Sequence, residues 1–216
     1  MLANELPALI GVMPVIVIIV VITIIQRMKE KEAEKEIERI VSEALIVTPQ
    51  MKESLLQFPL ENTLELRSMQ PQELINLLSC CTNALAVFEK HEELISDGYC
   101  LYDKLIGNHY EPSFVKFMDS IFGSKGKEAH KKKKYASLKE KLDIHKDEVL
   151  ATFEKDLMME GSVLHIIPEK YRLSIILNMM SGYLSDGEVE TWEGCIKSFK
   201  DDEHRITPNG ELLILS

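Results

Sequence analysis

The chain has 216 residues, and its 35 acidic against 25 basic side chains give a formal net charge of −10. This acidity argues against a general nucleic-acid binder, because such proteins usually carry a basic surface. The four cysteines lack C-x-x-C spacing and two of them are adjacent, which is awkward for a disulfide framework and indicates reduced, mostly buried thiols.

Residues 6–25, LPALIGVMPVIVIIVVITII, contain no charged side chain and only one polar side chain, Thr23. Twenty residues at the helical rise of about 1.5 Å reach about 30 Å, which matches the hydrocarbon thickness of a bilayer. We therefore predict a single transmembrane helix over 6–25, preceded by a short tail over 1–5. A buried strand or core helix is the alternative, but the segment is longer and more uniformly apolar than such elements.

Every residue from 15 to 25 is β-branched, which favours a strand in water. In lipid the preference reverses, because only a helix pairs all of its own backbone groups, and Pro14 is expected to bend that helix. A cleaved signal peptide is disfavoured, because basic residues follow the segment and only Glu5 precedes it. This charge order predicts a single-pass protein of the cell membrane, with the N-terminus outside and the remainder in the cytoplasm. The basic residues that follow are Arg27, Lys29, Lys31, Lys35 and Arg39.

Residues 26–45 contain strong helix formers and no glycine or proline, which predicts a charged amphipathic stalk helix continuous with the span. Its apolar residues fall at helical spacing and form one narrow stripe. The stripe is either the face by which the stalk packs on the following domain or the seam of a short coiled-coil dimer. Its members are Ala33, Ile37, Ile40, Val41, Ala44 and Leu45.

Prolines at 49 and 59 predict a connector over 46–70, with short extended pieces such as 63–66. Apolar periodicity then predicts a multi-helix domain over 71–205, followed by a C-terminal tail over 206–216. The expected helices cover 71–95, 99–106, 111–122, 135–160, 169–184 and 188–205, with Gly98 as a stop signal and 163–167 as a strand or link. The fold class is therefore mainly α.

A basic loop is predicted over 123–134, because this segment is rich in glycine and lysine. Residues 125–146 hold nine lysines against three acidic residues, a local charge of +6 in an acidic chain. Three interpretations remain open: a solvated loop, a patch that contacts anionic lipid, or a contact for nucleic acid. The candidate residues for an anionic surface are Lys131, Lys132, Lys133 and Lys134.

The C-terminal region carries Tyr183-Leu184, Gly187, Thr191, Glu193, Ile196, Phe199, Asp202 and His204-Arg205. This pattern resembles a helical hairpin of uncharacterised proteins from Gram-positive bacteria and their mobile elements, of the form YL-x-x-GRADTLKEAINLYE-x-x-x-HR. The chain departs from that form at 188–190, at Trp192 and at 194–195. The resemblance implies a hairpin and a bacterial source, and it implies no activity.

A Walker loop, a dinucleotide-binding glycine pattern, H-E-x-x-H and a nucleophile elbow are all missing from the sequence. We therefore assign no catalytic, cofactor-binding or metal-binding residue, and we expect His145, on an apolar helix face, to belong to the core. The predicted function is a membrane-anchored scaffold that binds a protein partner or itself. One alternative is an enzyme whose site gathers His91, His165 or His204 with a carboxylate or cysteine. The other is a lipid or nucleic-acid binder acting through the basic loop.

Overall fold

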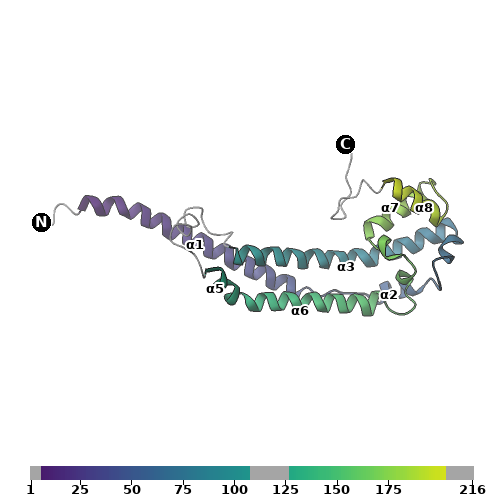
Figure 1. The fold of residues 1–216 in the computed structure, drawn as a ribbon, viewed down its shortest axis with the longest axis horizontal. Helices are drawn as coiled ribbons and strands as arrows, with labels where there is room; N and C mark the ends of the chain where they lie inside the picture. Colours follow the sequence, from purple (N-terminus) through teal and green to yellow (C-terminus); the bar gives the residue numbers. More distant parts are fainter. Residues whose placement is uncertain (1–5, 108–126, 203–216) are drawn as a thin grey trace. The chain divides into compact units, whose positions relative to one another are not determined.

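The structure is a computed structural model that describes residues 6–107 and 127–202, with the side chains of residues 6–17, 19 and 127–129 not included. The predicted helix over 111–122, residues 123–126 of the basic loop and both terminal tails lie outside the described residues. All regular elements that are described are helices, which confirms a mainly α fold (Figure 1). None of the residues in these ranges forms a strand.

The chain divides into two compact units. The first combines Met1–Glu43 with Leu94–His145, and the second combines Ala44–Glu93 with Lys146–Ser216. Residues of the predicted domain over 71–205 contribute to both units.

Helix α1, Leu6–Ser42, covers the predicted span and most of the predicted stalk as one uninterrupted element. The predicted continuity between these two segments is therefore confirmed. Near its end, Arg39 pairs with Glu36 and Glu43 on the same helix, each with a nitrogen to oxygen distance of 2.8 Å. Such pairs at spacings of three and four add modestly to helix stability.

Within the described ranges, no helix is long and apolar enough to cross a membrane. The predicted span therefore stays a prediction.

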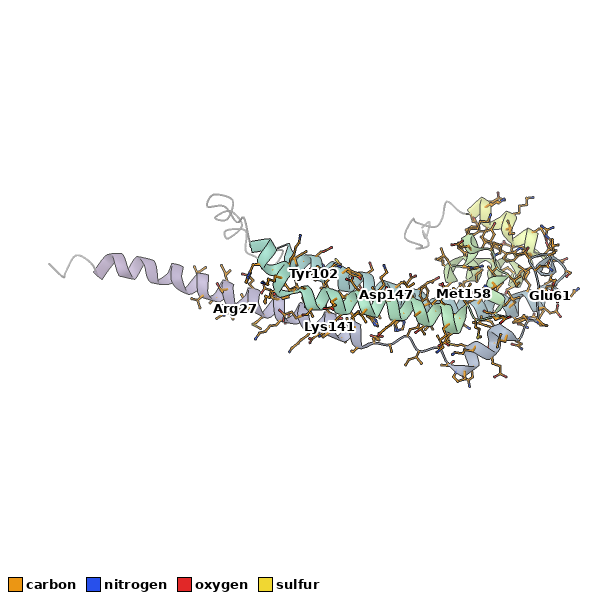
Figure 2. All side chains as sticks on the ribbon, turned by 60° about the horizontal axis from the view of Figure 1, so that its bottom comes forward. Arg27, Glu61, Tyr102, Lys141, Asp147 and Met158 are labelled. Atoms are coloured by element: carbon orange, nitrogen blue, oxygen red, sulfur yellow. The ribbon has the colours of Figure 1, made fainter. Side chains whose placement is uncertain are left out.

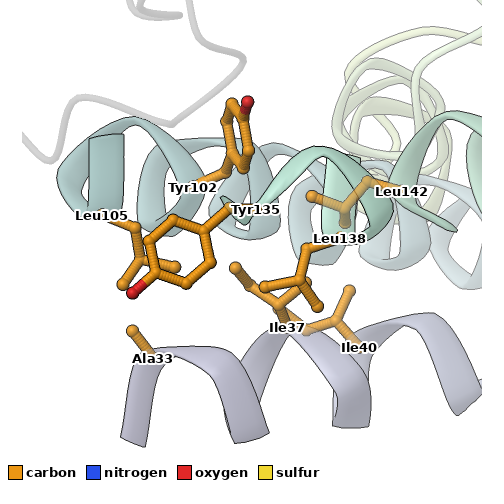
Figure 3. Packing of buried hydrophobic residues seen from close by; sticks show 8 residues of the cluster. All are labelled: Ala33, Ile37, Ile40, Tyr102, Leu105, Tyr135, Leu138 and Leu142. Atoms are coloured by element: carbon orange, nitrogen blue, oxygen red, sulfur yellow. The ribbon is translucent and has the colours of Figure 1, made fainter. Parts of the chain in front are cut away.

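Three residues of the predicted stripe, Ala33, Ile37 and Ile40, are buried inside the first unit (Figure 3), whereas Ala44 and Leu45 follow α1 and belong to the second unit. The three buried residues pack on residues from the second half of α3 (Pro71–Ile106), from α6 (Ala136–Thr152) and from the turn before α6. This arrangement confirms that the stalk packs on the rest of the chain, and it leaves Ile37 and Ile40 with no exposed surface for a coiled-coil partner. The buried cluster consists of Ala33, Ile37, Ile40, Tyr102, Leu105, Tyr135, Leu138 and Leu142.

Gly98 lies inside α3, so the prediction that it ends a helix is wrong. A Cβ atom at this position would lie 2.7 Å from Cδ2 of Leu142 and 3.7 Å from Ile40. A larger residue here would force Leu142 to shift, so the close approach of three helices favours glycine in spite of its low helix propensity.

The second unit begins with α2, Pro49–Leu56, in the region predicted as a connector. The Thr48 hydroxyl accepts from the Met51 amide, and Pro49 occupies the first turn, so the proline starts a helix instead of preventing one. The predicted extended piece over 63–66 is also wrong, because Glu65–Arg67 forms a 3-10 turn, η1, that buries Leu66.

Helix α6 and its extension cover most of the predicted helix over 135–160, and His145 is buried as expected. The helix widens at its end into a π-helical turn, η2, Phe153–Leu157. Phe153 stacks on Phe88 of α3 with ring centroids 4.1 Å apart. Two 3-10 turns follow, η3 (Val163–His165) and η4 (Glu169–Tyr171), so residues 163–167 form a link with a 3-10 turn and not the strand that the sequence left open.

The predicted C-terminal hairpin is confirmed as α7, Ser174–Ser185, in contact with α8, Trp192–Asp202. Gly187 turns the chain between them with a φ of +73°. Tyr171 lies edge-on to Trp192 and Phe199, with ring centroids 6.0 and 5.9 Å away. These aromatic contacts fix α8 in the core of the second unit.

Candidate functional site

The four candidate lysines lie on a helix, α5, Lys127–Lys134, so the loop prediction is wrong for these residues. Lysine is a good helix former, and acidic side chains of α1 balance the repulsion between the lysines. Lys131 is half-buried, whereas Lys132, Lys133 and Lys134 are exposed.

Three glutamates of α1, spaced four residues apart, form ion pairs with three lysines. Lys131 Nζ lies 3.2 Å from Glu30, and both side chains are mostly buried, with 15% and 13% of their surfaces exposed. The other pairs are Lys134 with Glu34 at 3.7 Å and Lys141 with Glu38 at 3.5 Å, the latter lysine labelled in Figure 2. We call these six residues the lysine–glutamate seam. Lys131 and Lys134 thus neutralise charge within the protein.

Tyr135 contacts two residues of the seam, Glu30 and Lys134. Its ring is buried, and its hydroxyl donates to Glu30 at 3.4 Å and accepts from Lys134 Nζ at 2.6 Å. Burial raises the pKa of the Tyr135 phenol, and the hydrogen bond with the phenol raises the pKa of Lys134. Both groups therefore keep their protons at neutral pH.

The seam places α5 beside the end of the predicted span. Glu30 follows Ile25 by five residues, which corresponds to about 7.5 Å along a helix. Lys131 lies against Glu30, and its neighbours in α5, Lys132 and Lys133, are exposed.

A second surface feature of the first unit is a groove of about 210 Å³ between α1 and α3. Its accessible apolar lining comes from the partly exposed Leu94 and Leu101, which lie beside the buried Ile40. Charged side chains surround this lining on both helices, and the exposed thiol of Cys100 lies among them. The charged residues are Glu36 and Arg39 from α1 and Asp97 and Lys104 from α3.

In the second unit, a wider hollow of about 640 Å³ is lined by residues of α2 and its C-cap, among them Gln50, Glu53 and Gln57. All of its lining side chains come from one short segment. No set of polar groups from different elements converges on it, as a catalytic pocket would require.

The two described histidines of the enzyme alternative bind backbone carbonyl oxygens. His91 Nδ1 lies 2.9 Å from the Val87 oxygen and Nε2 lies 3.2 Å from the Ala44 oxygen, while His165 Nε2 lies 2.8 Å from the Met158 oxygen. Neither ring of the pair is directed at a carboxylate or thiol. His204 lies outside the described residues.

All four cysteines are free thiols, and burial raises the pKa of three of them. The pKa of Cys195 is raised to about 11, so this thiol stays protonated at neutral pH and is a poor nucleophile. Across residues 6–107 and 127–202, no group of three or more His, Cys, Asp or Glu side chains is arranged to hold a metal ion.

No family model, curated protein or solved structure matches this chain. The functional argument therefore rests on its own residues. Sequence reasoning missed the seam and the groove, although the spacing of Glu30, Glu34 and Glu38 was a readable signal for a helix that receives basic partners.

Proposed function

We propose that this chain is a single-pass membrane protein that acts as a helical scaffold. Residues 6–25 anchor it in the cell membrane with the N-terminus outside, and the helical remainder lies in the cytoplasm. There it holds a protein partner, or a second copy of itself, close to the bilayer.

The exposure of apolar side chains along α1 supports this proposal. Ile18, Val20, Val21, Ile24, Ile25 and Met28 are about half exposed, and they lie within eleven residues of one helix. Contiguous apolar surface of this kind is rare on proteins surrounded by water and marks a membrane or protein contact. The charge-free stretch 6–25 within a single helix is the observation that carries the proposal.

Alkaline carbonate extraction tests the anchor. The intact chain is expected to stay in the membrane pellet, because about twenty buried apolar residues hold it there without electrostatic contacts. Recovery in the supernatant would contradict the proposal.

Cys100 provides the test of orientation, because its thiol is exposed while Cys81 and Cys195 are buried. A membrane-impermeant maleimide should label Cys100 only after the cells are opened. A Cys100→Ala variant supplies the background from Cys80. Labelling of intact cells would place this part of the chain outside.

A pull-down in detergent, with the full chain and with a version lacking residues 1–26, tests the scaffold role. A specific partner recovered with both versions assigns recognition to the helical units. A partner lost with the truncation assigns recognition to the anchor.

Contact with anionic lipid headgroups is a second candidate function, favoured by the exposure of Lys132 and Lys133 next to Lys131, which pairs with Glu30 of α1. Each lysine near an acidic leaflet contributes about 1 kcal/mol. Replacing both residues by Gln should weaken binding to phosphatidylserine vesicles, with a smaller difference at high salt. The matched control replaces Lys139 and Lys155, two lysines outside α5. Equal loss in both variants, or loss of RNA binding alone, would contradict the lipid contact.

A further inference from the structure

We propose that the groove between α1 and α3 is the site at which a second copy of this chain binds, giving a parallel twofold dimer. This inference rests on the proposed function, because a shared membrane gives both copies the same orientation. The dimer gives the partner and the binding surface, neither of which the proposed scaffold role specifies.

The alignment of α1 and α3 along their common length determines which charged residues of the two helices lie at the same height. Ile40 of α1 lies against Gly98 of α3, and Ala33 lies beside Leu105 (Figure 3). The two helices therefore run in opposite directions, with one residue of α1 matching one residue of α3. By this count Arg39 is level with position 99, close to Asp97. Glu36 is level with position 102, close to Lys104.

A twofold axis along the helices brings α1 of one copy opposite α3 of the other at the same level. Arg39 then faces the Asp97 of the second copy, and Glu36 faces its Lys104. In such an interface each contact occurs twice, so four opposite-charge pairs surround the apolar lining. The charged residues of the groove on one copy therefore face residues of opposite charge in the same groove of the other copy.

The size of the groove agrees with an association that needs the membrane. Stable interfaces between proteins in solution involve about 20–30 residues on each side, whereas eight described residues line this groove. Anchoring both copies in one bilayer raises their effective concentration, so a weaker interface suffices.

Cys100 reports on the dimer, because it lies in the groove and a twofold axis through the groove brings the two Cys100 thiols together. Intact cells are treated with a membrane-permeant, short-arm bismaleimide, and the fraction of cross-linked chain is measured. A product is expected that disappears with Cys100→Ala.

Charge reversal separates contacts between chains from contacts within one chain. Asp97→Arg alone sets Arg39 against an introduced arginine twice, and Arg39→Glu alone sets an introduced glutamate against Asp97 twice. Each variant alone should lose about fivefold of its cross-linked product or more. When both are co-expressed with different tags, the mixed pair carries an opposite-charge pair at both positions, so product between the two tags should return. Asp103→Arg, the same charge change at an exposed residue outside the groove, should leave the product unchanged.

Cross-linked product is expected to return between two variants that each lose it when expressed alone. Such a return cannot come from repaired folding, because each chain still carries its own substitution. Absence of a Cys100-dependent product, or absence of product between the co-expressed variants, overturns the dimer. A chain that stays in the carbonate pellet without cross-linking contradicts the dimer and leaves the anchor standing. Cross-linking of a chain that carbonate releases contradicts the anchor instead.

Discussion

At the scale of single residues, Glu89 of α3 supplies the N-terminal cap that α7 lacks. The capping position of α7 is Leu173, which has no polar side chain. Glu89 accepts a hydrogen bond from the Ser174 amide at 2.7 Å and another from the Ser174 hydroxyl. A carboxylate at this place also interacts favourably with the helix dipole.

Replacement of Glu89 by Gln should lower the free energy of unfolding by about 1–2 kcal/mol, because a charge-assisted cap is lost. Trp192 is the only tryptophan of the chain and is buried in the same unit, so its fluorescence during urea unfolding of the detergent-purified protein measures the change. An unchanged unfolding midpoint would show that Glu89 does not hold α7.

Glu92, three residues along the same helix, is the matched control and should respond in the opposite direction. Burial raises the pKa of its carboxyl, the charge of Glu89 adds to this, and Lys146 opposes it. A raised pKa means that the folded state binds the proton more tightly than the unfolded state. The charged form therefore costs stability, and this cost appears as the pH rises from 4.5, the ordinary pKa of a glutamate carboxyl, through the higher pKa of the folded state. At pH 7, Glu92→Gln should raise the free energy of unfolding by up to about 0.5 kcal/mol, and this gain should vanish below pH 4.

Gly98 and Gly182 provide a pair of helical glycines with opposite expected responses to alanine. At Gly98 the new methyl group would meet Leu142 at 2.7 Å, whereas at Gly182 nothing lies within 4 Å. Alanine gains about 1 kcal/mol of helix propensity at either site, but overpacking costs about 1–3 kcal/mol at Gly98. We therefore expect Gly98→Ala to speed amide hydrogen exchange over residues 94–106.

Gly182→Ala should stabilise α7 by about 0.5–1 kcal/mol, as read from Trp192 fluorescence. Addition of Leu142→Val to Gly98→Ala removes the clashing methyl group and should recover part of the protection from exchange. Equal stabilisation by alanine at both glycines would contradict the close packing at Gly98.

At the scale of elements, the lysine–glutamate seam is expected to hold α5 on α1. Lys131→Met keeps the apolar stem but leaves Glu30 mostly buried without its cation, which should cost about 1–3 kcal/mol. Lys139→Met is the control, because Lys139 and Asp143 form a pair within α6 whose side chains are about half exposed. That pair should contribute little to stability, because solvent screens it.

Hydrogen exchange of α1 amides measures the effect of the seam substitution. Exchange over residues 29–38 should accelerate for Lys131→Met and stay unchanged for Lys139→Met. Because the Lys131 pair is shielded from solvent, the difference should persist at high salt. Similar exchange in both variants would show that the seam adds nothing to the packing of Ile37 and Ile40.

Helix identity was readable from local sequence, while helix ends and partners were not. The continuity of residues 6–42 and the amphipathic pattern of 136–152 follow from propensity and periodicity alone. Gly98 was misinterpreted because its reason is a contact with Leu142, 44 residues away. The helical state of α5 was missed because it depends on acidic side chains about a hundred residues earlier in the chain.

The candidate surfaces were predicted even less completely. Composition identified Lys131–Lys134 as a charged group, but only the fold shows that Lys131 and Lys134 pair with α1. The groove between α1 and α3 combines charges separated by about sixty residues, and its order of signs depends on helix register. Register is set by packing at positions such as Ile40 and Gly98, which no local pattern encodes.

At the scale of the whole molecule, the proposed role depends on whether residues 6–25 remain in a bilayer, and a single charge tests this. Ile16→Arg places a guanidinium near the middle of the stretch, where insertion costs about 2.5–3.5 kcal/mol. Ile46→Arg is the control, because Ile46 is apolar too, is 71% exposed and lies outside α1. The carbonate-resistant fraction should fall for Ile16→Arg and stay at the original level for Ile46→Arg. If both variants remain fully in the pellet, the chain is held by something other than this stretch, since a protein contact would tolerate the charge while a lipid core would not.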